Sequence, residues 1–180
     1  MELIDALEQT FQYAHGVIGN VRADQLDNPT PCTEWAVRDL LGHTIGVVAG
    51  LGAAASGTQP AEFVLGPDPA AQFQQAAKSA LDAWNAPGVF DRVIDGGAGP
   101  MPGRVLAGIN LLDTATHAWD IATATGQPVG LPDDVAAVAL EVSRATISPD
   151  IRGGRFGPEI PAPDGAGPTE QLVAFLGRQP

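Results

Sequence analysis

The sequence holds a single cysteine, Cys32, and a single lysine, Lys78, in 180 residues. One cysteine permits no disulfide bond within the chain and excludes a zinc site built from several thiolates. A chain of this length can bury an apolar core large enough to fold without a disulfide or a structural metal. We therefore expect one domain over residues 1–180, in which a bound metal would serve function rather than folding.

Basic residues are scarce as well: 9 Lys and Arg stand against 21 Asp and Glu, for a formal net charge of -12. With so few cations to offset phosphate repulsion, we expect neither nucleic acid nor an anionic membrane as a partner. The N-terminus lacks the basic start of a signal peptide. The longest apolar stretch, residues 45–55, is glycine-broken and shorter than the ~20 residues that span a bilayer. A cytoplasmic protein is expected.

Hydrophobic periodicity and helix-start signals predict an all-α fold. Asp68-Pro69 is typical of a helix start, and Thr33 is the expected N-cap of the second helix. Helices are predicted at residues 2–20, 35–55, 69–86, 102–124 and 133–146, four of them long. The modest connections favour an antiparallel four-helix bundle with short extra helices and an irregular C-terminal segment.

The remaining segments give weaker signals. Residues 89–94 are strand-like, and a glycine-rich loop, GGAGPMPG, follows at 96–103. The loop lacks the G-K-[ST] ending of a phosphate-binding loop, so we expect a turn. Residues 148–168, rich in Pro and Gly, should be irregular, before a short helix at 169–176.

A polar stripe interrupts the apolar helix predicted at 102–124. Asn110, Asp113, His117 and Asp120 lie three or four residues apart and share one face. Burying an uncompensated carboxylate costs several kcal/mol even after relaxation. A metal ion, an arginine or a water-filled cleft would each compensate the two acidic groups.

His43 on the second helix supplies a matching group, beside the small residues Gly46 and Gly50. Small neighbours leave room for an open metal site, and they equally suit close packing of another helix. Asp113 and His117, at i, i+4 spacing, can reach one ion together with a histidine from a second helix. Two nitrogens and one oxygen suit Zn²⁺ with open positions, and Ni²⁺ and Fe²⁺ accept the same set. The residues alone leave a metal site and a hydrogen-bonded core network both open.

Two motifs carry a resemblance to a known family. The stretch PCTEWAVRDLLGH, followed by LLDTATHAWDIATATGQP, resembles the DinB-like metal-binding superfamily. Within it, the chain is similar to the actinobacterial branch around the metal-binding domain of mycothiol-dependent maleylpyruvate isomerase, and its C-terminal run resembles an uncharacterised subfamily. The resemblance implies a DinB-like four-helix bundle with three metal ligands, which match His43, Asp113 and His117. Aspartate replaces the longer glutamate of the isomerase, so helix and ion must lie closer together.

The function implied by the resemblance is a thiol-dependent transferase or isomerase. Its partners would be a small-molecule thiol such as mycothiol and an electrophilic substrate, with zinc stabilising the thiolate. A non-catalytic module that binds a metal or a small ligand is the alternative, and an Fe²⁺ oxygenase ranks last. Exposed helical faces would permit a homodimer.

Further residues are expected around the centre. Asp39 and Asp120 would orient His43 and His117 through the free ring nitrogens, while Asn110 and Arg38 would lie within reach of a ligand. Three other residues leave two interpretations open. Cys32 precedes a helix start, which can lower the pKa of a thiol, but its flanking prolines favour a structural role. Arg152 and Arg155 either fold over the cleft or remain solvated.

Overall fold

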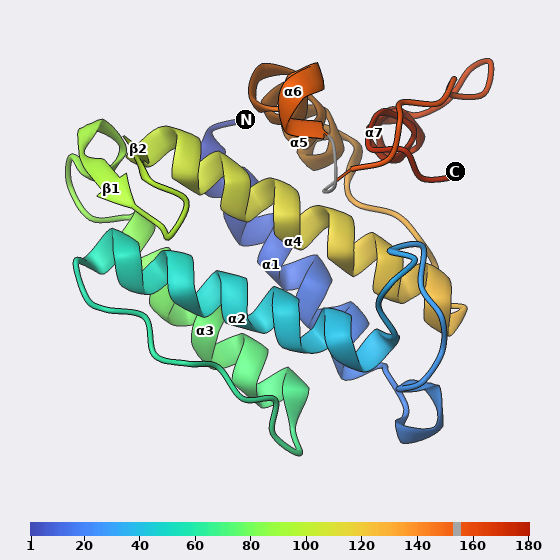
Figure 1. The fold of residues 1–180 in the computed structure, drawn as a ribbon, viewed down its shortest axis with the longest axis horizontal. Helices are drawn as coiled ribbons and strands as arrows, with labels where there is room; N and C mark the ends of the chain where they lie inside the picture. Colours follow the sequence, from blue (N-terminus) through green and yellow to red (C-terminus); the bar gives the residue numbers. More distant parts are fainter. Residues whose placement is uncertain (153–155) are drawn as a thin grey trace.

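The computed structural model describes residues 1–152 and 156–180, and it confirms the all-α prediction. A bundle is formed by four long helices (Figure 1): α1 (Leu3–Gly19), α2 (Val37–Ser56), α3 (Pro69–Trp84) and α4 (Gly103–Thr125). α5 (Asp133–Thr146) packs on α4 and α1, and α7 (Pro168–Phe175) packs on α5. The short elements are α6 (Pro149–Arg152), the 3-10 turns η1 (Ala23–Gln25) and η2 (Val89–Asp91), and a hairpin of β1 (Val93–Asp95) and β2 (Pro100–Pro102).

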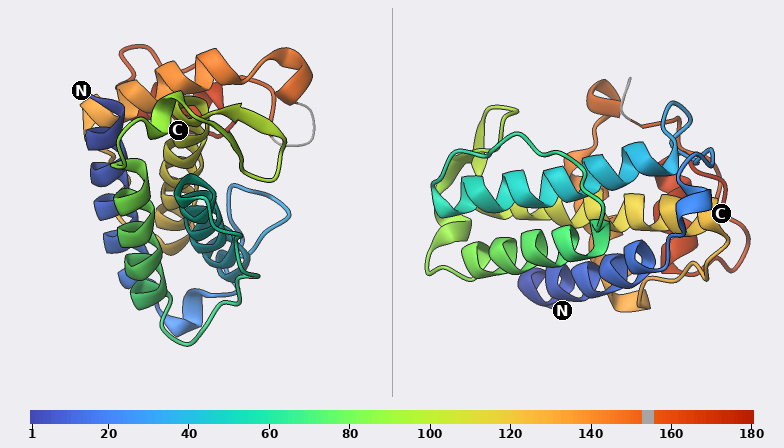
Figure 2. Two further views of the ribbon diagram at one scale, coloured as in Figure 1. Left: turned by 90° about the vertical axis from the view of Figure 1, so that its left-hand side faces the viewer. Right: turned by 90° about the horizontal axis from the view of Figure 1, so that it is seen from below.

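The helices of the bundle do not simply alternate in direction. α1 and α4 run one way, and α2 and α3 run the other (Figures 1 and 2). Gly52 and Ala80, each late in its helix, meet at the α2–α3 contact, as parallel neighbours require. The crossover at residues 57–68 returns along α2. This is possible because twelve extended residues reach up to about 40 Å, whereas the helix is only about 30 Å long.

The small residues on α2 accommodate this crossover. A Cβ atom on Gly46 would lie 3.3 Å from Phe63, and one on Gly50 would lie 3.8 Å from Pro60. One predicted use of these glycines, close packing of another helix, is not what the structure shows, because a loop packs on them instead. They make room for a loop beside the helix that carries His43.

The central position of α4 explains why a polar face is buried. α4 contacts α1, α2 and α5, so buried side chains lie on every side of it. Asn110, His117 and Asp120 are therefore enclosed along with the leucines of the same helix. Gly126, at a φ of 67°, ends the helix in the left-handed conformation that glycine adopts easily.

Two helix starts test the predicted caps. The Asp68 carboxylate accepts a hydrogen bond from the Ala71 N–H at 3.0 Å, with Pro69 at the first helical position, as predicted for α3. The prediction of Thr33 as the N-cap of α2 is wrong: α2 starts at Val37, and Asp39 accepts a hydrogen bond from the backbone N–H of Ala36.

The segment before α2 is fastened to the end of α4. Gln25 Nε2 donates to the carbonyl of Thr125, and Asn28 Nδ2 donates to that of Ala124, each at 2.9 Å. Carbonyl groups in the last turn of a helix have no partner within the helix, so side-chain donors satisfy them. These bonds hold residues 28–36 over the C-terminal half of α4.

The glycine-rich loop is the turn that its sequence predicts. Asp95 Oδ1 accepts hydrogen bonds from the N–H groups of Gly97 and Gly99, and both glycines have positive φ. These N–H groups are occupied within the hairpin. The strand predicted at 89–94 is a 3-10 turn followed by the shorter strand β1.

The C-terminal segment is less irregular than predicted, because α6 falls within residues 148–168. Arg152 does not remain solvated: its Nη1 donates to the carbonyls of Gly157 (2.9 Å) and Phe175 (2.7 Å). The guanidinium also lies over the Phe175 ring. Arg152 therefore ties α6 to the end of α7. Arg155 lies outside the described residues.

Within residues 1–152 and 156–180, α2 is the one helix long and apolar enough to cross a bilayer by length and composition. A core helix of a bundle meets the same criterion. The apolar stripe of α2, including Leu40, Leu41, Ile45 and Val48, is fully buried against the other helices. The bundle core accounts for its composition.

The α2–α3 contact gives a first prediction. A Cβ on Gly52 would lie 2.8 Å from Ala80 Cα, so we expect Gly52→Ala to lower the free energy of unfolding by about 1–3 kcal/mol through overpacking. Gly50→Ala, on the same helix with space for a methyl group, should raise it by up to about 1 kcal/mol through helix propensity. Urea unfolding measures both, and equal stabilisation by the two changes would contradict the packing described.

Candidate metal centre

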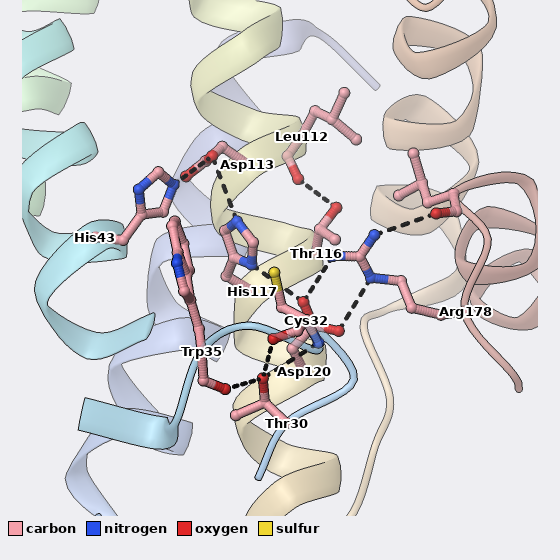
Figure 3. A network of polar contacts seen from close by, with 11 residues as sticks. Thr30, Cys32, Trp35, His43, Leu112, Asp113, Thr116, His117, Asp120 and Arg178 are labelled. Carbon is pink, nitrogen blue, oxygen red and sulfur yellow. Dashed lines mark hydrogen bonds and ion pairs between the residues drawn. The ribbon is translucent and has the colours of Figure 1, made fainter. Parts of the chain in front are cut away.

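Three predicted side chains meet between α2 and α4 (Figure 3). His43 Nε2 lies 3.0 Å from Asp113 Oδ2, and His117 Nε2 lies 3.7 Å from the same oxygen. One donor atom from each residue lies within 4.8 Å of the others. The structure thus brings together the triad that the sequence nominated.

The donor set fits a divalent ion. Ligands about 2.0–2.2 Å from a tetrahedral zinc ion stand about 3.3–3.6 Å apart, between the two donor separations observed here. Asp113 Oδ1 is buried and has no hydrogen-bond partner among the described residues. A buried carboxylate oxygen without a partner is costly, and a cation bound by both oxygens of Asp113 would satisfy it. The geometry favours a cation site over a core network closed by hydrogen bonds alone.

Asp120 contacts the ring nitrogen of His117 that does not face the triad. His117 Nδ1 lies 3.1 Å from Asp120 Oδ2, the contact that the i, i+3 spacing predicts. Burial by itself would raise the pKa of Asp120, but hydrogen bonds from His117 and Arg178 outweigh it and hold the pKa below its usual range. An ionised carboxylate only accepts, so Nδ1 carries the proton. In the neutral ring, Nε2 then keeps its lone pair toward Asp113.

Arg178 is the residue that sequence reasoning missed. Its Nε and Nη2 donate to the two oxygens of Asp120 at 3.0 and 2.9 Å (Figure 3). Burial opposes the charge of Arg178, but the hydrogen bond to Asp120 prevails and raises the pKa of the guanidinium. The buried acidic groups indicated that an arginine was one possible partner. No spacing pattern links positions 120 and 178.

Two predicted neighbours of the centre have other roles. The Asp39 carboxylate, expected to orient His43, is used at the start of α2, where it accepts from Ala36. Arg38, expected near the ligand, pairs instead with Asp27 at the surface. The turn before α2 needs a hydrogen-bond acceptor, and Asp39 is in position to supply one.

Asn110 is enclosed rather than open to a ligand. It is fully buried, and neither its amide nitrogen nor its oxygen has a partner among the residues described. The hydroxyl groups of Thr44 and Thr114 are in the same state. Asn110, expected in a cleft, is therefore buried in the interior, one helical turn before Asp113.

The loop before α2 forms a wall of the centre. The Trp35 ring centroid lies 4.6 Å from that of His43 and 5.9 Å from that of His117. Thr30 Oγ1 fixes this loop by donating to the carbonyls of Trp35 and Cys32. The side chains of His43 and Asp113 remain 30% and 21% exposed, which leaves the centre accessible from that side.

Cys32 lies in the same loop, and its thiol is not activated. Burial, and then the negative charge of Asp120, raise the pKa of Cys32. The lowered pKa considered for a cysteine before a helix start is absent, since α2 begins five residues later. A raised pKa leaves the thiol protonated at neutral pH, which favours the structural role.

A separate hollow of about 380 Å³ lies between α5, α7 and residues 159–166. The residues that line it include Arg144 and Gln171 but no member of the triad.

Comparison with known proteins identifies the family. Residues 7–122 match the family described as "Mycothiol maleylpyruvate isomerase N-terminal domain". The chain belongs to this family. The matched range contains all three triad residues, and the resemblance read from the sequence motifs is confirmed. Residues 123–180, with α5, α7 and Arg178, lie outside the isomerase N-terminal domain match.

Relatives of this member of the isomerase N-terminal domain family occur in Mycobacterium tuberculosis. "Uncharacterized protein MT0763" of strain CDC 1551 / Oshkosh and "Uncharacterized protein Rv0738" of strain ATCC 25618 / H37Rv are each 41% identical over 165 residues. The alignments cover 90% of this chain and 90% of each relative. No solved structure matches the chain.

The raised pKa of Cys32 gives a second prediction. We expect the rate of alkylation by iodoacetamide to reach half its maximum at a higher pH in the folded protein than in the same chain in urea, because less thiolate forms at each pH. Mass spectrometry follows the single modification. A folded-state midpoint at or below the unfolded one would show that the thiol is activated after all.

Proposed function

We propose that the protein binds a divalent metal ion, Zn²⁺ in preference, at His43, Asp113 and His117, and uses it to activate a low-molecular-weight thiol such as mycothiol for reaction with an electrophilic small molecule. The reaction class is S-transfer or isomerisation. The observation that carries the proposal is the convergence of two imidazole nitrogens and a carboxylate with an orphaned oxygen, in a chain of the mycothiol maleylpyruvate isomerase N-terminal domain family.

The charges around the centre suit an anionic ligand. Zinc, when bound, supplies Lewis acidity that stabilises a thiolate at neutral pH. Two neutral imidazoles and the Asp113 carboxylate leave the loaded site with a net charge of about +1. Asp120 would cancel this charge, but Arg178 neutralises Asp120. The centre can therefore attract a thiolate.

The protein's own groups hold and shield the site. Asp120 keeps the proton on Nδ1 of His117, so that Nε2 faces the triad. The Trp35 ring packs against one side of both imidazoles. A thiol and its electrophile would approach over the exposed edges of His43 and Asp113. We place this chemistry in the cytoplasm, where thiols are kept reduced.

The metal assignment is tested by elemental analysis of protein purified without an affinity tag. We expect close to one divalent ion per chain, with zinc predominating, and loss of most of it in His43→Ala, Asp113→Ala and His117→Ala because each change removes a donor. His15→Ala is the matched control, since His15 lies on α1 outside the triad. Stoichiometric metal in all three triad variants would rule the site out.

The thiol step is tested by calorimetry. Mycothiol should bind the zinc-loaded protein, with binding lost in the metal-free protein and in Asp113→Ala, because the thiolate requires the cation. Consumption of an electrophile with added mycothiol would then show catalysis. Absence of binding at millimolar thiol in a zinc-loaded protein would contradict the thiol chemistry and favour a non-catalytic metal-binding module.

A further inference from the structure

The C-terminal tail reaches the metal centre through one buried side chain. Arg178 is 8% exposed, and Asp120, which it contacts through two hydrogen bonds, is fully buried. Asp120 in turn contacts His117 of the triad. A continuous chain of contacts thus runs from Arg178 through Asp120 to His117.

The turn after α7 is built to direct this side chain inward. Gly177 has a φ of 81°, and the N–H of Arg178 donates to the carbonyl of Val173 at 2.9 Å. This is the reversal typical of a glycine helix end. A Cβ on Gly177 would lie 2.7 Å from Gly157 Cα, so the tail packs backbone against backbone at this point. The placement of Arg178 is therefore tightly determined.

Each nitrogen of the guanidinium donates a hydrogen bond to the protein. Nε and Nη2 donate to Asp120, and Nη1 donates to the carbonyl of Leu176 at 3.2 Å. A side chain used in this way is not offered to a substrate. Arg178 acts on the triad through Asp120. It restrains the position of the Asp120 carboxylate and neutralises its charge.

We propose that Arg178 is a positioning residue of the metal centre, and that the C-terminal tail is thereby part of the centre although it lies outside the family match. Arg178 fixes the Asp120 carboxylate, which fixes the ring of His117 with Nε2 toward the ion. The inference rests on the proposed metal site. Outer contacts of this kind change metal affinity by about 10–100-fold when removed.

The test compares metal binding by Arg178→Met, which keeps length and apolar volume but removes the charge and its donors, with that of the unaltered protein. Zn²⁺ affinity is measured by competition with a chromophoric chelator, and Co²⁺ absorption reports coordination. We expect Arg178→Met to weaken Zn²⁺ binding about 10–100-fold and to change the Co²⁺ spectrum. Arg178→Lys keeps the charge without the paired donors, so its Zn²⁺ affinity should lie between those of Arg178→Met and the unaltered protein. It replaces Arg178→Met in the test if that variant does not fold.

Two controls separate positioning from a general loss of stability. Gly52→Ala is expected to lower stability at the α2–α3 contact without touching the triad, so its Zn²⁺ affinity should match that of the unaltered protein. In an Asp120→Asn background, Arg178→Met should weaken binding much less than it does alone, because the two residues act in series.

Unchanged affinity and an unchanged Co²⁺ spectrum in Arg178→Met would overturn the inference while leaving the metal site intact. Equal weakening in Gly52→Ala would overturn it as well. An unaltered protein that binds no Zn²⁺ would instead remove the proposed function, and this inference with it.

Discussion

Burial of the Asp120 carboxylate is the constraint on which the rest of the site depends. An isolated charge in a protein interior costs several kcal/mol, and α4 is covered by α1, α2 and α5. The chain compensates Asp120 with the N–H of His117 on one side and Arg178 on the other. Satisfying this one acid fixes an imidazole tautomer, anchors the C-terminal tail and orients Nε2 of His117 toward Asp113.

The two acidic groups of α4, Asp113 and Asp120, differ in burial and in hydrogen-bond partners, and this difference determines which of them is available to a ligand. Asp120 is fully buried and neutralised inside the protein. Asp113 is partly exposed, contacts two histidines and keeps one buried oxygen without a partner among the described residues. The protein therefore leaves a carboxylate beside two imidazoles at an accessible edge, an arrangement that a cation would complete.

Local patterns in the sequence predicted the parts of this structure that local forces decide. The i, i+4 pair of Asp113 and His117, the cap at Asp68 and the long helices follow from spacing and helix-end chemistry. Contacts across the fold left no such pattern. Arg178 lies 58 residues from Asp120 in a tail without strong periodicity, and nothing in the glycines of α2 distinguishes a crossing loop from a packed helix. Asp39 was assigned by spacing to an imidazole, but the backbone N–H of Ala36 competes for the same carboxylate.

The turn at Gly177 also bears on how modular this fold is. A boundary drawn where the recognised family region ends, at residue 122, would separate Asp120 from the arginine that balances it. An excised fragment or a chimaera joined at that point would carry an unmatched anion in its interior and a misdirected histidine. Four helices make the recognisable scaffold, but the contacts that neutralise Asp120 extend to Arg178, directly after the turn at Gly177.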